Sequence, residues 1–203
     1  MKNQAQVKGI QGYAGSVQKF ITATLAVDFF DLYRDFAELI PKIPGQILDI
    51  GAGIGRDSWE FSKMGHSVLA AEPTAVYRAV GKKMFPSQNI QWVDSSLPEL
   101  KLPGKDKHFD FLVASAIFHH LDKAEQHEAI VRICSLLNAG GIFILSLRNG
   151  PPGVGTHVFP TNSSEIIKSA ASCGLKVLLH KSNQPSLLKH KESVVWSRLA
   201  FQK

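Results

Sequence analysis

The stretch Ile47–Ser58, ILDIGAGIGRDS, decides the fold because it joins a strand pattern to a helix pattern through glycines. Its first four residues predict a buried strand, and Arg56–Met64 has the apolar spacing of a helix that Gly65 ends. Three alternating glycines lie between the two elements, at Gly51, Gly53 and Gly55. Since glycine has no side chain, such a junction lets the backbone approach a ligand closely.

Strand and helix patterns then alternate along the chain. Buried strands are predicted at Ser67–Glu72, Ile90–Val93, Phe109–Ser115 and Ile142–Leu147. Helices are predicted at Ala75–Phe85, at Lys123–Leu137 and after Asn162, which forms a cap with Glu165. Asp122 and Glu125 predict a capping box for the second of these helices, and we expect the glycines of Ala139–Gly141 to end it.

The two ends of the chain complete this pattern. Apolar residues at helical spacing predict one or two helices within Ser16–Ile40, which Pro41–Gly45 ends. Leu175–His180 and Ser193–Phe201 are predicted strands, and the loop between them is too short for a parallel crossover, so the last strand should be antiparallel. The sequence therefore predicts an α/β, Rossmann-like doubly wound sheet of seven strands, mostly parallel with the last strand antiparallel and with helices on both faces.

Composition limits the class of protein. The 203 residues predict one domain, with an N-terminal helical cap at 1–44 and a core at 45–203. Two cysteines, Cys134 and Cys173, are too few for a disulfide framework and favour core packing in a cytoplasmic protein. We expect no membrane segment or secretory signal, because no apolar run has the length that either needs. The net charge of +6 comes from scattered basic residues, which argues against a nucleic-acid partner.

The glycine loop suits two classes of nucleotide-like ligand. Arg56 stands where the dinucleotide pattern G-x-G-x-x-G needs its last glycine, and no Gly-Lys-Ser/Thr follows to make a Walker loop. Carboxylates lie at the ends of consecutive strands: Glu72 is placed to bind a ribose diol, and Asp94 an adenine amino group. With Asp49 they would repel a pyrophosphate and attract a sulfonium with an α-ammonium. This favours S-adenosylmethionine as the cofactor.

The motifs resemble those of a known family. ILDIGAGIGRDS, VLAAEP, WVDSSLPEL, FDFLVASAIFHHLD and LLNAGGIFILSL are similar, in this order, to the motifs of class I S-adenosylmethionine-dependent methyltransferases. The small bacterial type 11/12 enzymes, which methylate small molecules, are the most similar kind. The resemblance is strong over residues 46–147 and implies the same sheet, ending in an antiparallel strand.

The resemblance also implies a set of cofactor-binding residues. Asp49, Gly51, Ala52, Gly53 and Gly55 would line the methionine part of S-adenosylmethionine. Glu72 with Pro73 would bind the ribose, and Asp94 with Ser95 the adenine. Ser115 through Phe118 would form the floor beneath the reacting methyl group.

Two histidines and a long loop are the candidates for chemistry on the acceptor. His119 is the predicted catalytic base, ahead of His120, because it lies nearer the end of the fourth strand. On a helix neighbouring side chains point about 100° apart, so at most one histidine should face the cleft. They lack a third convergent ligand, so no metal site is predicted. The loop Arg148–Thr161 is a predicted substrate lid with Arg148 and His157 as polar contacts, and Tyr13 with the N-terminal helices closes the other side.

Three functions compete at this point. The first is methyl transfer from S-adenosylmethionine to a small-molecule acceptor, by a monomer or homodimer. The second is a non-catalytic or regulatory S-adenosylmethionine-binding protein. The third, a nicotinamide-dependent oxidoreductase, is disfavoured by Arg56 and by the predicted antiparallel strand. The residues after the fourth strand, SAIF, also differ from the Asn/Asp-Pro-Pro-aromatic motif of enzymes that methylate nucleobase amines.

Overall fold

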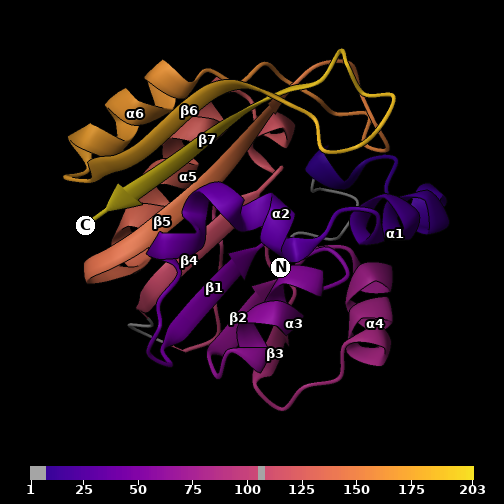
Figure 1. Ribbon diagram of the computed structural model, residues 1–203, viewed down its shortest axis with the longest axis horizontal. Helices are drawn as coiled ribbons and strands as arrows, with labels where there is room; N and C mark the ends of the chain where they lie inside the picture. The colour runs from indigo at the N-terminus through magenta and orange to yellow at the C-terminus, as the bar shows by residue number, and fades with distance from the viewer. Residues whose placement is uncertain (1–7, 105–107) are drawn as a thin grey trace.

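The computed structural model describes residues 8–104 and 108–203, and its centre is a twisted sheet (Figure 1). Within those residues, seven strands are arranged in the order β3-β2-β1-β4-β5-β7-β6. The strands are β1 (Gln46–Ile50), β2 (Ser67–Ala71), β3 (Ile90–Val93), β4 (Phe109–Ser115), β5 (Leu137–Asn149), β6 (Lys176–Pro185) and β7 (Val195–Gln202). The first five pair in parallel, and β7 is antiparallel to both of its neighbours, as predicted.

Helices cover both faces of the sheet. The α-helices are α1 (Val17–Leu25), α2 (Phe29–Tyr33), α3 (Arg56–Lys63), α4 (Ala75–Met84), α5 (Lys123–Leu136) and α6 (Ser163–Ser172). The main 3-10 turns are η2 (Lys8–Ile10), η3 (Ala14–Ser16), η4 (Arg34–Leu39) and η5 (Phe118–His120). The predicted N-terminal cap at 1–44 includes residues 1–7, which lie outside the described residues.

Strand alternation divides the core into two layers. On β1, Leu48 packs with the apolar faces of α5 and α6, whereas its neighbour Ile47 packs with α2, η4 and α3. Successive side chains on a strand point to opposite faces, so a strand that is apolar throughout needs a cover on each side. The doubly wound architecture is therefore confirmed. Within the described residues, no helix is both long and apolar enough to cross a membrane.

Local signals explain where the helices begin. Asp122 and Glu125 form the predicted capping box of α5, with both hydrogen bonds at 2.9 Å. Asn162 caps α6 by accepting from the amides of Ser164 and Glu165. These side chains satisfy amides that have no partner inside the helix.

The predicted glycine cap of α5 was wrong, although the predicted last residue, Leu137, was only one position off. The helix ends at Leu136, and β5 begins at Leu137, so that Ala139–Gly141 belongs to the strand. Gly140 does have the positive φ (+77°) expected of a helix cap, but its amide donates to Lys203 O, and Lys203 N donates to Gly141 O. Pairing with the end of the chain, which lies far away in sequence, overrides the local signal.

An ion-pair cluster joins the N-terminal helices to the far side of the sheet. Asp35 on η4 accepts from Lys181 Nζ on β6 at 2.5 Å and from Arg198 on β7. Burial raises the pKa of Asp35, but the hydrogen bonds from Lys181 and Arg198 outweigh this effect and leave the pKa below its ordinary value. The carboxylate therefore stabilises the folded state in its charged form.

Asp35→Asn should lower the free energy of unfolding at pH 7 by about 1.5–3 kcal/mol, because it weakens hydrogen bonds between charged groups. A lowered folded pKa stabilises above the unfolded value and loses its effect as the pH falls through the folded value. The difference between variant and wild type should therefore shrink below about pH 4 in urea titrations. Asp31→Asn, which breaks an exposed pair with Arg34, is the control and should cost less than about 1 kcal/mol. Equal losses in the two variants would contradict this role for Asp35.

Candidate active site

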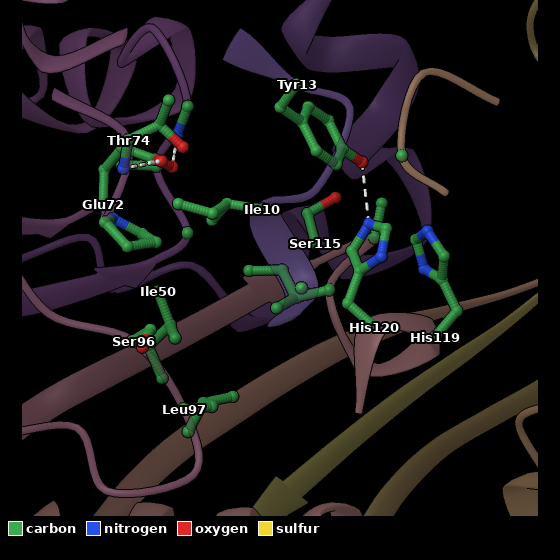
Figure 2. A pocket seen from close by; sticks show the side chains of 18 of the residues that line it. Ile10, Tyr13, Ile50, Glu72, Thr74, Ser96, Leu97, Ser115, His119 and His120 are labelled. Carbon is green, nitrogen blue, oxygen red and sulfur yellow. Dashed lines mark hydrogen bonds between the residues drawn. The ribbon is translucent and has the colours of Figure 1, made fainter. Parts of the chain in front are cut away.

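A large cavity opens at the carboxyl ends of the central strands. Its volume is about 1250 Å³, and residues that follow β1, β2, β3, β4 and β5 line it together with the N-terminal segment. Most of the predicted cofactor residues are in its wall: Asp49, Gly51, Ala52, Gly53, Glu72, Pro73, Asp94, Ser95 and Ser115. Open parallel sheets place their ligands at this edge. In Figure 2, Glu72 and Thr74 lie on one side of the cavity and Tyr13, His119 and His120 on the other.

The glycine loop is fixed by backbone hydrogen bonds to the end of β2. Gly51 N and Ala52 N donate to Ala71 O at 2.7 and 3.1 Å, and Gly53 N donates to Glu72 Oε2 at 2.9 Å. Gly53 has a φ of +56°, and a Cβ there would lie 2.9 Å from the ring of Phe20. The loop thus needs glycine both for its conformation and for the close approach of the N-terminal helix.

Two predicted cofactor residues lie outside the cavity wall. Gly55 is the N-cap residue of α3 and has a φ of +81°. A Cβ there would lie 2.7 Å from the Trp92 ring, so this glycine makes room for an aromatic side chain. Phe118 is fully buried in the core layer beneath η5. Ala116 and Ile117 line the cavity where Phe118 was expected. The resemblance placed the floor at Ser115 through Phe118, but Phe118 begins η5 and its side chain packs in the core layer.

Glu72 is a buried carboxylate held by two backbone amides. Thr74 N donates to Oε1 at 2.7 Å, and Gly53 N donates to Oε2. Burial raises the pKa of Glu72, although the hydrogen bonds from Thr74 and Gly53 act in the opposite direction. The side chain of Thr74 also forms a hydrogen bond with this carboxylate. Two carboxylate oxygens have about four acceptor positions together, so acceptor capacity is left for a ligand.

Asp49 adds a second buried carboxyl group. Ser58 Oγ donates to Asp49 Oδ2 at 2.5 Å. Burial, with the charge of Asp57 as the next cause, raises the pKa of Asp49 to about 7. Asp57 is in turn paired with Arg56 at 2.6 Å. A cation bound beside Asp49 would therefore meet a group that ionises near neutral pH.

Arg56 has a role that the sequence did not reveal. Its guanidinium donates to Thr24 O at 2.6 Å and Val27 O at 2.9 Å, at the end of α1. The residue that replaces the last glycine of a dinucleotide pattern thus ties the N-terminal helix to the cofactor loop. A cation followed by an acid is too common a dipeptide to signal such a contact.

The third predicted carboxylate lies at the rim of the cavity. Asp94 is exposed and accepts from Arg78 at 2.9 Å, and Arg78 also donates to Glu72 O at 2.6 Å. Ser95, which follows it, is buried in the cavity wall. Asp94 and Glu72 are thereby fixed relative to each other through one arginine.

The other half of the cavity contains the histidine pair. Both His119 and His120 line it, with ring centroids 4.0 Å apart, so the expectation that only one could face the cleft was wrong. They lie in the 3-10 turn η5, which puts neighbouring side chains about 120° apart, so the turn alone does not bring them together; the cavity is wide enough to reach both rings. His119 Nδ1 is buried without a hydrogen-bond partner in the part of the chain that the structure describes. Burial lowers the pKa of His119 to about 2, and the charges of His120 and Arg148 act in the same direction.

His120 has partners on both ring nitrogens. Its Nδ1 lies 2.7 Å from His157 O, and its Nε2 lies 2.7 Å from Tyr13 Oη (Figure 2). A carbonyl can only accept, so Nδ1 carries the proton and Nε2 accepts from the tyrosine hydroxyl. The predicted contact His157 thus acts through its backbone, whereas Arg148 lines the cavity itself.

The N-terminal segment and the predicted lid meet over this half. Thr156 N donates to Gln11 O at 3.1 Å, and Tyr77 Oη donates to Tyr13 O at 3.0 Å. Phe20 stacks on Tyr77 with ring centroids 4.4 Å apart. Phe20 and Tyr77 were not predicted as site residues, because their apolar spacing is that of any buried helix face.

His119→Gln should make folding less sensitive to acid. A histidine with a lowered folded pKa binds fewer protons when folded, so stability falls as the pH drops below the unfolded value of about 6.5. Each pH unit below that value costs about 1.4 kcal/mol for one such group. Urea titrations at pH 6 and 5 should show that the variant loses less stability than wild type by about this amount. His127→Gln changes an exposed imidazole and is the control; an unchanged slope in His119→Gln would contradict the prediction.

Comparisons with known proteins agree with this geometry. Residues 47–141 match the family model described as "Methyltransferase domain". An uncharacterized methyltransferase of Alkaliphilus oremlandii is 33% identical over 105 residues, which cover 52% of this chain and 46% of that protein. The chain thus spans about half the length of the curated relatives that it matches.

Solved structures share the fold over most of the chain. A TehB-like SAM-dependent methyltransferase from Corynebacterium glutamicum has a TM-score of 0.68 at 21% identity, covering 95% of this chain and 97% of that one. The 1,6-didemethyltoxoflavin-N1-methyltransferase of Burkholderia thailandensis has a TM-score of 0.63 at 19% identity, with coverages of 94% and 88%. The strand order and the match over residues 47–141 thus support a class I methyltransferase domain in this part of the chain.

Proposed function

We propose that the protein transfers a methyl group from S-adenosylmethionine to a small-molecule acceptor. One observation carries the proposal: a single cavity brings together the glycine loop after β1, the buried Glu72 after β2 and Asp94 after β3. These groups suit the methionine, ribose and adenine parts of the cofactor in that order. The family match over residues 47–141 supports the same chemistry.

The charges of the cavity fit S-adenosylmethionine better than a dinucleotide. Asp49 and Glu72 are buried carboxyl groups beside the glycine loop. Arg56, the cation that follows the loop, is already paired with Asp57 and with carbonyl groups at the end of α1, and Arg78 is paired with Asp94. A pyrophosphate would find no unpaired cation in this loop, whereas the α-ammonium and sulfonium of S-adenosylmethionine would meet carboxylates.

The cavity also has room for an acceptor. Pockets for one small ligand usually measure about 300–1,000 Å³, and this cavity is larger, at about 1250 Å³. Its second half, over β4, β5 and β7, is lined by Ile117, Arg148, Val158 and Trp196. The similar Burkholderia thailandensis enzyme contains 1,6-didemethyltoxoflavin together with S-adenosylhomocysteine. We infer that the acceptor here is likewise a small molecule and that the reaction takes place in the cytoplasm.

When bound, S-adenosylmethionine supplies an activated methyl group on a positively charged sulfur. The protein then has to orient the acceptor and exclude water. Gly51 and Ala52 hold the loop in place through Ala71 O, and Phe20 covers Gly53 from the N-terminal side. The loop Arg148–Thr161, which contacts Gln11, covers the second half of the cavity, where the acceptor would bind and which we call the acceptor half.

S-Adenosylmethionine and S-adenosylhomocysteine should raise the melting temperature, and NAD should not. A ligand at about 100 times its dissociation constant adds about 2.7 kcal/mol, which corresponds to about 5–10 °C for a domain of this size. Differential scanning fluorimetry gives the answer directly. A shift with NAD alone would overturn the proposed cofactor. A shift with S-adenosylmethionine but no methyl transfer to any acceptor in a broad screen would favour the non-catalytic binding protein.

Binding of S-adenosylmethionine should release a proton from Asp49. The pKa of Asp49 is raised to about 7, and a bound cation would lower it, so the affinity should rise with pH up to about 7. Calorimetry should show binding about tenfold tighter at pH 8 than at pH 6, with an apparent heat that depends on the buffer. Asp49→Asn should lose this pH dependence, whereas Asp94→Asn, the control, should weaken binding and keep it. Equal wild-type affinities at the two pH values would exclude the proposed contact.

A further inference from the structure

We infer that Tyr13 and His120 form a proton-accepting pair, and that the acceptor is a planar aromatic compound with a weakly acidic hydroxyl group. The inference rests on the proposed function and specifies its substrate class. It begins from the hydrogen bond between Tyr13 Oη and His120 Nε2, which lies in the cavity wall opposite Glu72 (Figure 2).

The hydrogen bonds around His120 determine in which direction a proton can move between Tyr13 and His120. His120 Nδ1 donates to His157 O, so Nε2 is the basic nitrogen and receives the hydrogen bond of Tyr13. The lone pairs of Tyr13 Oη are therefore free to accept a proton from a ligand in the cavity. His119 lacks such a chain, because its Nδ1 is buried without a partner among the described residues.

The groups around His120 keep its imidazole neutral. Burial lowers the pKa of His120; the hydrogen bond to His157 O acts the other way, and the charges of His157 and Arg148 lower the pKa further. Tyr13 and His119 are the other titratable groups against the ring, with centroids 5.3 and 4.0 Å away. A neutral imidazole is the form that can take up a proton.

The surrounding wall selects the acceptor. Ile10, Ile117, Val158, Leu187, Leu188 and Trp196 make it apolar, which suits a flat ring. Arg148 lies close enough to Tyr13 to lower the pKa of its hydroxyl, although burial, the larger cause, raises that pKa to about 12. The same guanidinium would stabilise an oxyanion formed on the acceptor beside Tyr13.

The acceptor hydroxyl gives its proton to Tyr13 Oη while the Tyr13 proton moves to His120 Nε2, so that His120 becomes an imidazolium. The acceptor oxygen forms a bond to the methyl carbon as the bond from that carbon to the sulfonium breaks. The sulfur keeps the electron pair and becomes neutral, and His120 later loses its proton to solvent. Tyr13 is the catalytic residue because it touches the acceptor, and His120 acts through it.

Absorption spectroscopy with 4-nitrophenol tests the pair without knowledge of the natural acceptor. The protein is saturated with S-adenosylhomocysteine, and the probe is added roughly one pH unit below the midpoint of its own ionisation. Wild type should bind the probe as the coloured phenolate. Tyr13→Phe and His120→Gln should each bind it about tenfold or more weakly and without the phenolate band, because a hydrogen bond to a charged group is lost. His127→Gln, which changes an exposed imidazole outside the cavity wall, is the control and should keep the band. His119→Gln tests the alternative base, and 4-nitroanisole, which has no acidic proton, should discriminate little between the proteins.

The outcomes separate this inference from the proposed function. If S-adenosylhomocysteine does not bind to wild type, the proposed function fails. If it binds to all variants but 4-nitrophenol does not bind, or binds as phenolate equally in Tyr13→Phe and His120→Gln, the proton-accepting pair is wrong. Loss of the band only in His119→Gln would also overturn it and would return the base role to that residue.

Discussion

The hydrogen bond from Gly53 N to Glu72 Oε2 is the interaction on which the site depends. It joins the loop after β1 to the end of β2 and lies in the interior, where an unpaired carboxylate would be costly. Glu72 needs the two amides of Gly53 and Thr74 to remain buried, and the loop needs Glu72 to hold its left-handed glycines in place. The cofactor half of the cavity is thus preorganised by its own backbone.

The same glycine connects the sheet to the N-terminal segment. With no side chain at Gly53, the ring of Phe20 can lie directly over the loop and stack on Tyr77. Arg56 fixes the end of α1 through two carbonyl groups, and Asp35 fixes η4 to β6 and β7. The N-terminal helices therefore contact both halves of the sheet and cover the cavity between them. This arrangement explains why residues that precede β1 line the cavity.

Local patterns predicted the elements of this fold well, because apolar strands and helix caps depend on neighbours in sequence. The capping box at Asp122 and the antiparallel β7 were both confirmed. The predictions failed where distant contacts decide: Gly140 pairs with the last residue of the chain, and Gly55 makes room for Trp92. Phe118, which the resemblance placed in the cavity floor, begins η5 and packs in the core, a position that the motif alone does not reveal. Most of the proposed cofactor residues could be found from strand ends, but the contacts of Arg56 could not.

The acceptor half depends on parts of the chain that meet only in the folded state. Tyr13 precedes the first α-helix, His120 follows β4, and His157 lies in the loop after β5. The imidazole of His120 nevertheless forms hydrogen bonds with both Tyr13 Oη and His157 O. A side chain at Gly155 would collide with both Tyr13 and His120, because its Cβ would lie 2.6 and 2.7 Å from their rings. The loop must therefore carry glycine at this position to close over the pair. Since Tyr13 reaches His120 only when the N-terminal segment is in place, closing the cavity and completing the proton-accepting pair are one structural event. An acceptor hydroxyl would thus meet the pair only beneath the N-terminal segment and the loop Arg148–Thr161.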